Sequence, residues 1–201
     1  MNKTKLNAVI SDLKSFDWKQ VIDYGNNLGP KFNNAQWRFM KGLIMEKATE
    51  SYANDPTFKY VGEKHCDFTW EKHNITIEQK SKMADKFYTK KNKLKKTLNF
   101  ILTNSQGTNN STKISSSSVA DVLIGISSDG VVFAPKDVVM KYLTENGDGC
   151  VVNIPGSEII EITGYLEPGA TYENNLYEVL ITAMEENLMK ENDRKRLTKN
   201  K

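Results

Sequence analysis

Residues 67–80 constrain the fold of this chain more than any other segment, because polar and apolar residues alternate there on both sides of a short polar break. The sequence Asp67-Phe68-Thr69-Trp70 precedes the break, residues 71–74 form it, and Ile75-Thr76-Ile77-Glu78-Gln79-Lys80 follows it. Alternation with a period of two is typical of half-buried strands. The sequence therefore predicts two antiparallel strands joined by a tight turn within residues 71–74.

The predicted hairpin has one self-consistent register. Because successive side chains point to opposite faces of a strand, a reversal within residues 71–74 places Trp70 opposite Ile75 and Asp67 opposite Glu78. The apolar side chains then share one face: Phe68, Trp70, Ile75 and Ile77. The other face is polar and consists of Asp67, Thr69, Thr76, Glu78 and Lys80.

The polar face of this hairpin carries two carboxylates and a lysine. Directly opposite residues have Cβ atoms roughly 5 Å apart, where like charges destabilise a sheet unless something compensates them. Mg²⁺ would compensate Asp67 and Glu78, because it is commonly held by one or two carboxylates together with water and phosphate oxygens. Such an ion activates water and holds a scissile phosphate, and Lys80 could polarise that water or neutralise charge on the phosphate. These residues predict a magnesium site suited to phosphodiester cleavage.

An aspartate, a short turn and an acid-x-lysine sequence on the next strand resemble the PD-(D/E)xK nuclease superfamily, which includes the type II restriction endonucleases. The resemblance implies that Asp67 and Glu78 are metal ligands and that Lys80 is the catalytic lysine. It covers about fourteen residues, and the motif is degenerate. Cys66 stands where the family often has proline, at a permissive position. The resemblance also implies a restriction-endonuclease-like fold.

A simpler interpretation of the hairpin stays open, since an ordinary solvated hairpin face also carries Thr, Glu and Lys. The acid-x-lysine pattern occurs four times, starting at Asp12, Asp17, Glu78 and Asp193. Three of these lie in amphipathic, helical surroundings. Only Glu78 ends an alternating apolar strand and has an aspartate matched to it across a turn, which favours the metal site there.

A helix is predicted over about residues 35–53, capped by Asn33 or Asn34. Glu46 and Glu50 lie one turn apart on it. In nucleases of this superfamily a glutamate from the first core helix sometimes joins the metal site. The resemblance therefore implies Glu50, together with Glu46, as a further metal-ligand candidate. The alternative is a pair of glutamates that merely face water.

Candidate DNA-binding residues follow the hairpin. From Lys72 to Lys96 there are nine lysines and two acids, and such an excess of positive charge suits the binding of a polyanion. Residues 83–94 are predicted to be a basic helix. The alternative is that its lysines only form a solvated face. From Thr103 to Ser118, thirteen of sixteen residues are Ser, Thr, Asn or Gln, which predicts a long loop that is disordered or contacts a DNA groove. The candidates are Lys82, Lys86, Lys90, Asn104, Gln106, Asn109, Asn110 and Lys113.

The remaining segments predict strands with helices before, between and after them. Short helices are expected over residues 5–28, stopped by Gly25, Gly29 and Pro30, and a central strand over residues 98–102. A second hairpin, a helix from Pro135, two further strands and a C-terminal helix are expected at residues 119–134, 135–143, 150–163 and 172–196. This order indicates an α/β or α+β fold with a mixed central sheet flanked by helices. A single domain over residues 1–201 is expected, with residues 1–30 as an N-terminal helical segment and residues 103–118 as the polar loop.

Composition excludes several other classes of protein. Two cysteines without a CxxC pattern favour a reducing cytoplasm, and neither a signal peptide nor a run of roughly 20 apolar residues is present, so no membrane association is expected. His65 and His73 lack zinc-site spacing and are expected in surface or loop positions. Nucleotide-binding glycine loops and GxSxG are also missing from the sequence.

The sequence thus predicts a Mg²⁺-dependent, sequence-specific endonuclease similar to type II restriction enzymes, acting on double-stranded DNA. A homodimer is expected from the family resemblance and from the pseudo-two-fold symmetry of duplex DNA. Two alternatives remain. One is a non-catalytic nucleic-acid-binding protein, and the other is a repair or junction-resolving nuclease with the same fold.

Overall fold

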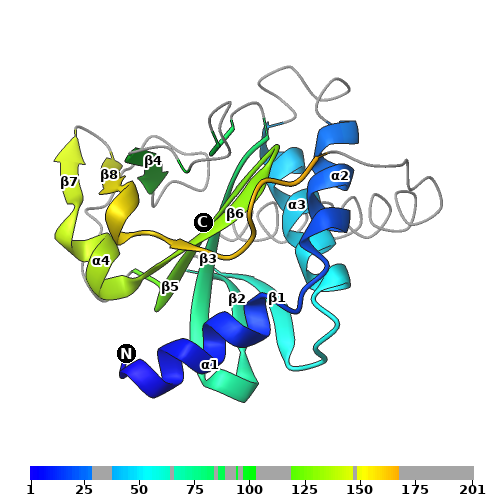
Figure 1. The fold of residues 1–201 in the computed structure, drawn as a ribbon, viewed down its shortest axis with the longest axis horizontal. Coiled ribbons are helices and arrows are strands. Elements are labelled where there is room, and N and C mark those ends of the chain that lie inside the picture. The colour runs from blue at the N-terminus through cyan, green and yellow to red at the C-terminus, as the bar shows by residue number, and fades with distance from the viewer. Residues whose placement is uncertain are drawn as a thin grey trace, which may run out of the picture.

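The computed structural model of this chain describes residues 1–28, 38–63, 66–83, 86–88, 94, 97–102, 119–146 and 149–167. They form a mixed α+β fold with a six-stranded sheet, a three-stranded sheet and helices around them (Figure 1). This agrees with the predicted class. The predicted polar loop at residues 103–118 and the predicted C-terminal helix at residues 172–196 lie outside the described residues.

The larger sheet carries the predicted hairpin. Its strand order is β1-β2-β3-β5-β6-β9, and only the β3–β5 pair is parallel. Its edge strand β1 is not predicted by the sequence pattern. The strands are β1 (Phe58–Glu63), β2 (Cys66–Trp70), β3 (Ile75–Lys82), β5 (Val122–Ser127), β6 (Gly130–Pro135) and β9 (Ile160–Glu161).

The smaller sheet combines one strand that lies between β3 and β5 in the chain with two strands that follow β6. It has the order β4-β8-β7, all antiparallel, with β4 (Thr97–Leu102), β7 (Leu143–Asn146) and β8 (Gly149–Pro155). Helix α4 (Lys136–Lys141) connects β6 to this sheet, and Pro135, which was predicted to be its first residue, is instead the N-cap residue that precedes it. The predicted strand at residues 98–102 is present as β4, but its predicted central position is wrong, because β4 is an edge strand of this second sheet. An apolar run predicts a strand, but it does not identify the strand with which that strand pairs.

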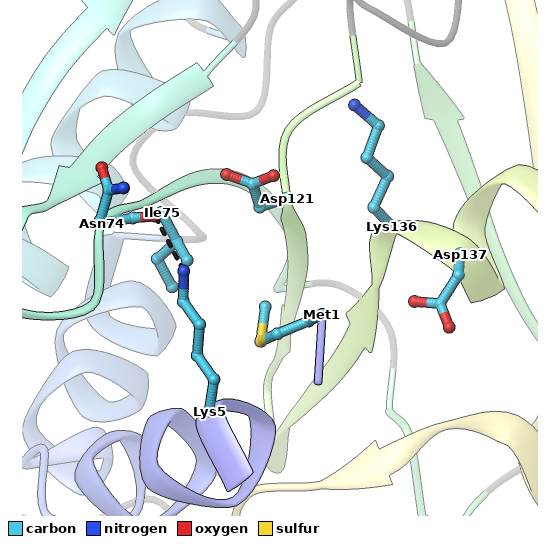
Figure 2. Close-up of a pocket in the computed structure, with 7 residues that line it drawn as sticks. All are labelled: Met1, Lys5, Asn74, Ile75, Asp121, Lys136 and Asp137. Atoms are coloured by element: carbon cyan, nitrogen blue, oxygen red, sulfur yellow. Dashed lines mark hydrogen bonds between the residues drawn. The ribbon is translucent and has the colours of Figure 1, made fainter. Parts of the chain in front are cut away.

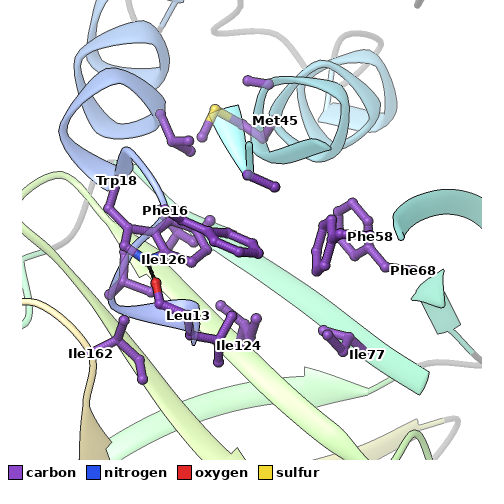
Figure 3. Packing of buried hydrophobic residues seen from close by; sticks show 14 of the residues in the cluster. Leu13, Phe16, Trp18, Met45, Phe58, Phe68, Ile77, Ile124, Ile126 and Ile162 are labelled. Atoms are coloured by element: carbon purple, nitrogen blue, oxygen red, sulfur yellow. Dashed lines mark hydrogen bonds between the residues drawn. The ribbon is translucent and has the colours of Figure 1, made fainter. Parts of the chain in front are cut away.

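Three helices pack on one face of the larger sheet: α1 (Lys3–Leu13), α2 (Trp18–Leu28) and α3 (Arg38–Tyr52). Figure 3 shows their aromatic and aliphatic side chains meeting those of β1, β2, β3 and β5 in one cluster. Gly25 does not stop α2 as predicted. It lies inside the helix, where a Cβ would come within 2.7 Å of Met45 Sδ and of Met83 Cε, so glycine at this position leaves room for these two methionine side chains.

The opposite face of the larger sheet is apolar at β5 and β6. Leu123 and Val132 pack there with Val139 of α4 and with Val152 and Ile154 of β8. All residues of β5 and β6 are therefore buried. In the β3–β5 ladder Glu78 lies beside Leu123, so the polar face of the hairpin continues this same side of the sheet.

The segment after β3 is not the predicted basic helix in its described part. Tyr88 forms an isolated antiparallel bridge with Leu94. The backbone N–H groups of Phe87 and Tyr88 donate to the buried carboxylate of Asp129, at 2.8 and 3.3 Å, instead of to carbonyls one helical turn earlier. A distant acid in the β5–β6 turn therefore overrides the local helical pattern.

Among the described residues, none of the helices combines the length and the apolar character that a membrane-spanning helix requires.

Candidate active site on the polar face of the hairpin

The β2–β3 hairpin has the predicted register. Trp70 pairs with Ile75 and Phe68 with Ile77, and these four side chains are buried in the core under the helices. The chain reverses through a short 3-10 helix, Glu71–His73, and through Asn74, whose φ of 47° is left-handed. The polar side chains consequently share the opposite face, and each is only half-buried.

The ladder ends one pair before the predicted partnership of Asp67 with Glu78. Asp67 instead turns its carboxylate to β3, where Oδ2 accepts the backbone N–H of Gln79 at 2.7 Å. This side-chain oxygen takes the place of a β2 carbonyl, so β2 separates from β3 without leaving that N–H unpaired. Asp67 is therefore fixed beside the residue that lies between Glu78 and Lys80.

Glu78 and Lys80 lie one pleat apart and on the same face of β3. The Lys80 ammonium donates to Glu78 Oε1 in a close ion pair. The side chain of Glu78 is 22% exposed and that of Lys80 is 30% exposed, so solvent reaches the pair. The structure thus brings together the three residues predicted as catalytic, with the ammonium already engaged by one of the two acids.

Among the described residues, the charges of two acids, Glu46 and Glu78, and of one lysine, Lys80, act on the carboxylate of Asp67. Burial, reinforced by the negative charges of Glu46 and Glu78, raises the pKa of Asp67 to about 8, against the effects of Lys80 and of the Gln79 N–H. Burial works to lower the pKa of Lys80, but the charges of Glu78, Asp67 and Glu46 outweigh it and raise that pKa. Lys80 is therefore held as an ammonium, and the excess carboxylate charge favours a proton or a metal cation at Asp67.

Helix α3 contributes Glu46 to this cluster, whereas Glu50 is engaged elsewhere. Glu50 Oε1 accepts the backbone N–H of Tyr60 at 2.8 Å, and its Oε2 pairs with Lys47 at 3.0 Å. Glu50 thus satisfies an N–H of the edge strand β1. The family resemblance implied Glu50, together with Glu46, as a metal-ligand candidate, but of the two it is Glu46 whose charge acts on Asp67 and Lys80.

We expect Glu46→Gln to flatten the pH dependence of stability in the metal-free protein. Because the pKa of Asp67 is raised on folding, the native protein holds a proton that the unfolded chain has released, so stability falls between about pH 4 and about pH 8. Removing the Glu46 charge lowers the pKa of Asp67 and makes this fall shallower. The midpoint of thermal unfolding, measured across the same pH range, gives the slope.

Glu50→Gln is the matched control, since it makes the same substitution one turn away. It is expected to keep the wild-type slope, because its carboxylate contacts Tyr60 and Lys47. A slope for Glu46→Gln that equals the slope for Glu50→Gln would contradict the electrostatic link between Glu46 and Asp67.

The donor chemistry of the cluster suits Mg²⁺. Within the part of the chain that the structure describes, no group of three or more His, Cys, Asp and Glu side chains is arranged to hold a metal ion. Mg²⁺ does not require such a cage, since it keeps several waters and is commonly held by one or two carboxylates and substrate phosphate oxygens. Asp67 and Glu78 supply two such carboxylates, and the pKa of Asp67 is raised first by burial and then by the charges of Glu46 and Glu78, which a bound cation would offset.

The other predicted residues are placed as follows. Lys82 lies at the end of β3 and is half-buried, and Lys86 is exposed. His73 lies in the hairpin turn, where its Nε2 meets Asp12 Oδ2 at 2.7 Å and its ring contacts Trp70 edge-on, so it fastens the turn to α1. The predicted residues outside the described part are His65, Lys90, Asn104, Gln106, Asn109, Asn110 and Lys113.

Sequence reasoning missed a clamp between β3 and the residue that precedes β5. Asp121 Oδ2 accepts both the N–H and the hydroxyl of Thr76, at 2.9 and 3.1 Å, while the Asp121 N–H donates to Thr76 Oγ1 at 3.1 Å. The clamp sits directly before the first pair of the parallel ladder, Ile77 with Val122. It fixes the register that points Glu78 and Lys80 to the polar face. The only signal in the sequence is an aspartate before an apolar strand.

Comparisons with known proteins found no matching family model and no significant match among curated proteins or solved structures.

Proposed function

We propose that this protein is a Mg²⁺-dependent DNA endonuclease of the restriction-endonuclease-like type. The observation that supports this most is the cluster of Asp67, Glu78 and Lys80 on one half-buried face, with Glu46 adding negative charge from α3. Carboxylates in excess beside a lysine are what metal-assisted phosphodiester hydrolysis needs, because a metal ion and a substrate phosphate then complete the charge balance. A six-stranded mixed sheet with helices on one face is compatible with the proposed fold.

Each residue has a distinct role in the proposed reaction. Asp67 and Glu78 would hold the ion, which when bound would activate water and neutralise charge on the scissile phosphate. The Gln79 N–H keeps the Asp67 carboxylate oriented. Lys80 remains protonated because the surrounding acids raise its pKa, so it serves as a hydrogen-bond donor to the charge that develops on the phosphate, and not as a base.

Double-stranded DNA is the proposed substrate, and a homodimer the proposed form. The lysine-rich sequence from Lys72 to Lys96 and the polar sequence from Thr103 to Ser118 supply cations and hydrogen-bonding side chains of the kinds that contact phosphates and base edges. A homodimer would present two such sites to a duplex with pseudo-two-fold symmetry. Sequence-specific cleavage, as in the type II enzymes, is part of this proposal.

The test is incubation of the purified protein with plasmid and phage DNA in the presence and absence of Mg²⁺. We expect discrete fragments with Mg²⁺ and intact DNA when a chelator removes the ion, since the carboxylates alone provide no activated water. Analysis of the products on a gel distinguishes discrete fragments from random degradation.

Other outcomes select the alternatives. Binding without cleavage at any Mg²⁺ or salt concentration would contradict the nuclease proposal and favour a non-catalytic nucleic-acid-binding protein. Cleavage confined to branched or damaged DNA would reject the restriction-enzyme assignment and favour a repair or junction-resolving nuclease.

A further inference from the structure

The chain changes faces of the larger sheet directly after β3. Met83 belongs to the buried cluster beneath the helices, whereas Phe87 and Tyr88 belong to the buried cluster on the opposite face, together with Leu123. Leu123 lies beside Glu78 in the β3–β5 ladder, so this opposite face is the one that carries the candidate active site. The chain therefore passes the end of β3 and enters the face of Glu78 at Phe87.

A buried carboxylate in the β5–β6 turn fixes the chain after this crossing. Asp129 is 1% exposed. It accepts the backbone N–H of Phe87 at 2.8 Å, that of Tyr88 at 3.3 Å and the hydroxyl of Ser127 at 2.8 Å. Ser127 is also the ladder partner of Lys82, the last residue of β3. Residues 82–87 are therefore bound at both ends to the same turn, and they are here called the tied loop.

The side chain of Tyr88 also holds the end of the tied loop. Its hydroxyl donates to the backbone oxygen of Thr163, and its ring meets that of Tyr165 edge-on at a centroid distance of 6.4 Å. The ring lies so close to Gly130 that a Cβ there would come within 2.3 Å of it. Because both the backbone and the side chain of Tyr88 are bound, the tied loop ends at a fixed position.

Lys86 is an exposed residue of the tied loop, and no described carboxylate pairs with it. It follows Lys82 by four residues, so its Cα lies at most about 14 Å from that of Lys82. Lys80 precedes Lys82 by about 7 Å on the same face of β3. At about 3.4 Å per nucleotide along one strand, Lys86 lies within roughly six nucleotides of the candidate active site.

Two other lysines are not placed in this way. Lys5 and Lys136 line a pocket of about 290 Å³ between α1, the hairpin turn and the start of α4 (Figure 2). Asp121 and Asp137 line the same pocket, and none of the three residues predicted as catalytic borders it. Acids thus balance the lysines of this pocket, which makes Lys136 a suitable comparison for Lys86.

From this arrangement we infer that Lys86 contacts the DNA backbone near the scissile phosphate and that Asp129 positions it through the tied loop. The inference rests on the proposed nuclease function for its substrate. A phosphate contact of this kind fixes the register of the strand on the enzyme without reading its sequence. Asp129 is a positioning residue, because it orders the tied loop before DNA arrives and so reduces the entropy that binding costs.

The first experiment measures the salt dependence of binding to a labelled random-sequence DNA duplex in a Glu78→Gln background, which prevents cleavage. Lys86→Ala is expected to reduce the slope of log affinity against log salt by about 1, the amount for one lost phosphate contact. Lys136→Ala is the control and is expected to leave the slope unchanged. Equal slopes for Lys86→Ala and Lys136→Ala would contradict the contact.

The second experiment tests whether Asp129 acts through Lys86. Asp129→Asn replaces one acceptor oxygen by an amide nitrogen that cannot accept, so the tied loop loses part of its anchor. In this background Lys86→Ala is expected to change the slope by much less than 1. Asp55→Asn is the matched control, since Asp55 also accepts a backbone N–H and a side-chain donor, from Thr57 and Trp70. It is expected to leave the effect of Lys86→Ala at its full size.

Tyr88→Phe is the milder second variant, because it removes only the hydroxyl that binds Thr163. If Asp129→Asn does not fold, the same comparison is made in the Tyr88→Phe background, where the effect of Lys86→Ala is again expected to be smaller than in the parent protein. An effect of equal size in the parent, loosened and Asp55→Asn backgrounds would leave Asp129 with a structural role alone and contradict its positioning of Lys86.

The outcomes separate this inference from the proposed function. If the wild type cleaves DNA but Lys86→Ala keeps the parent salt slope, the inference fails and the nuclease proposal stands. If the wild type never cleaves DNA but Lys86→Ala lowers the slope in a manner that depends on Asp129, the tied loop is retained as a DNA-binding element and the nuclease proposal fails.

Discussion

Lys80→Ala is expected to lower Mg²⁺-dependent DNA cleavage by about 10³-fold while DNA binding persists. The ammonium stands beside Glu78 and is kept protonated by the acids around it. Removing one preorganised donor from developing transition-state charge typically costs about 10²–10³ in rate, and the unpaired Glu78 adds a further charge against the phosphate. Single-turnover cleavage of plasmid DNA, together with a binding isotherm, measures the two effects separately.

Lys14→Ala provides the matched control for this experiment. It removes the lysine of another acid-x-lysine sequence, which begins at Asp12 and lies at the end of α1, so it tests whether the pattern matters outside the hairpin. Its cleavage rate is expected to equal that of the wild type. Equal rates for wild type and Lys80→Ala would remove the catalytic role of Lys80 and, with it, the main support for the nuclease proposal.

Asp67→Asn is expected to abolish cleavage and at the same time to stabilise the metal-free protein at alkaline pH. The folded protein raises the pKa of Asp67 to about 8 through burial and the charges of Glu46 and Glu78. The stability linked to this proton is fully present below the unfolded pKa of about 4 and is lost as pH rises through the folded value. A neutral amide carries no charge above that pH and can still accept the Gln79 N–H.

The measurement is the midpoint of thermal unfolding near pH 9 in the presence of a chelator. A gain of about 1 kcal/mol corresponds to roughly 2–4 °C for a chain of this size. Asp12→Asn is expected to lower the unfolding midpoint at this pH. Hydrogen bonds to Lys72 and His73 lower the pKa of Asp12, so the stability that its carboxylate contributes is present at neutral and alkaline pH. A lower midpoint for Asp67→Asn than for the wild type would contradict the assigned electrostatics.

The sequence predicted that Asp67, Glu78 and Lys80 share one face, but it predicted the wrong ladder partner for Asp67. Alternation sorted Phe68 and Ile77 to the core and Glu78 and Lys80 to the other face, because side-chain parity along a strand is a local property. The ladder nevertheless stops before Asp67, whose carboxylate bonds to the Gln79 N–H. Parity predicts which face a side chain occupies, but it does not predict where a side chain replaces a backbone acceptor.

Predictions were less successful where the outcome depends on contacts between residues that are far apart in the sequence. Glu46 and Glu50 are equivalent in the sequence pattern, and only the packing of α3 beside β1 sends Glu50 to the Tyr60 N–H. The lysine-rich segment after β3 has a helical pattern, yet Asp129 binds the N–H groups of Phe87 and Tyr88 from the β5–β6 turn. Both outcomes depend on residues many positions away in the chain.

The sequence by itself determined the hairpin, its turn, its two faces and the mixed helix and strand content, because each follows from short-range periodicity and turn chemistry. Only the tertiary structure decided that β3 pairs in parallel with β5, that Asp121 clamps Thr76 at that pairing, and that α3 contributes Glu46 to the acids around Lys80. The physical reason is that burial and charge interactions act through space. They join groups that no local pattern relates, and they alone set the proton affinity of Asp67.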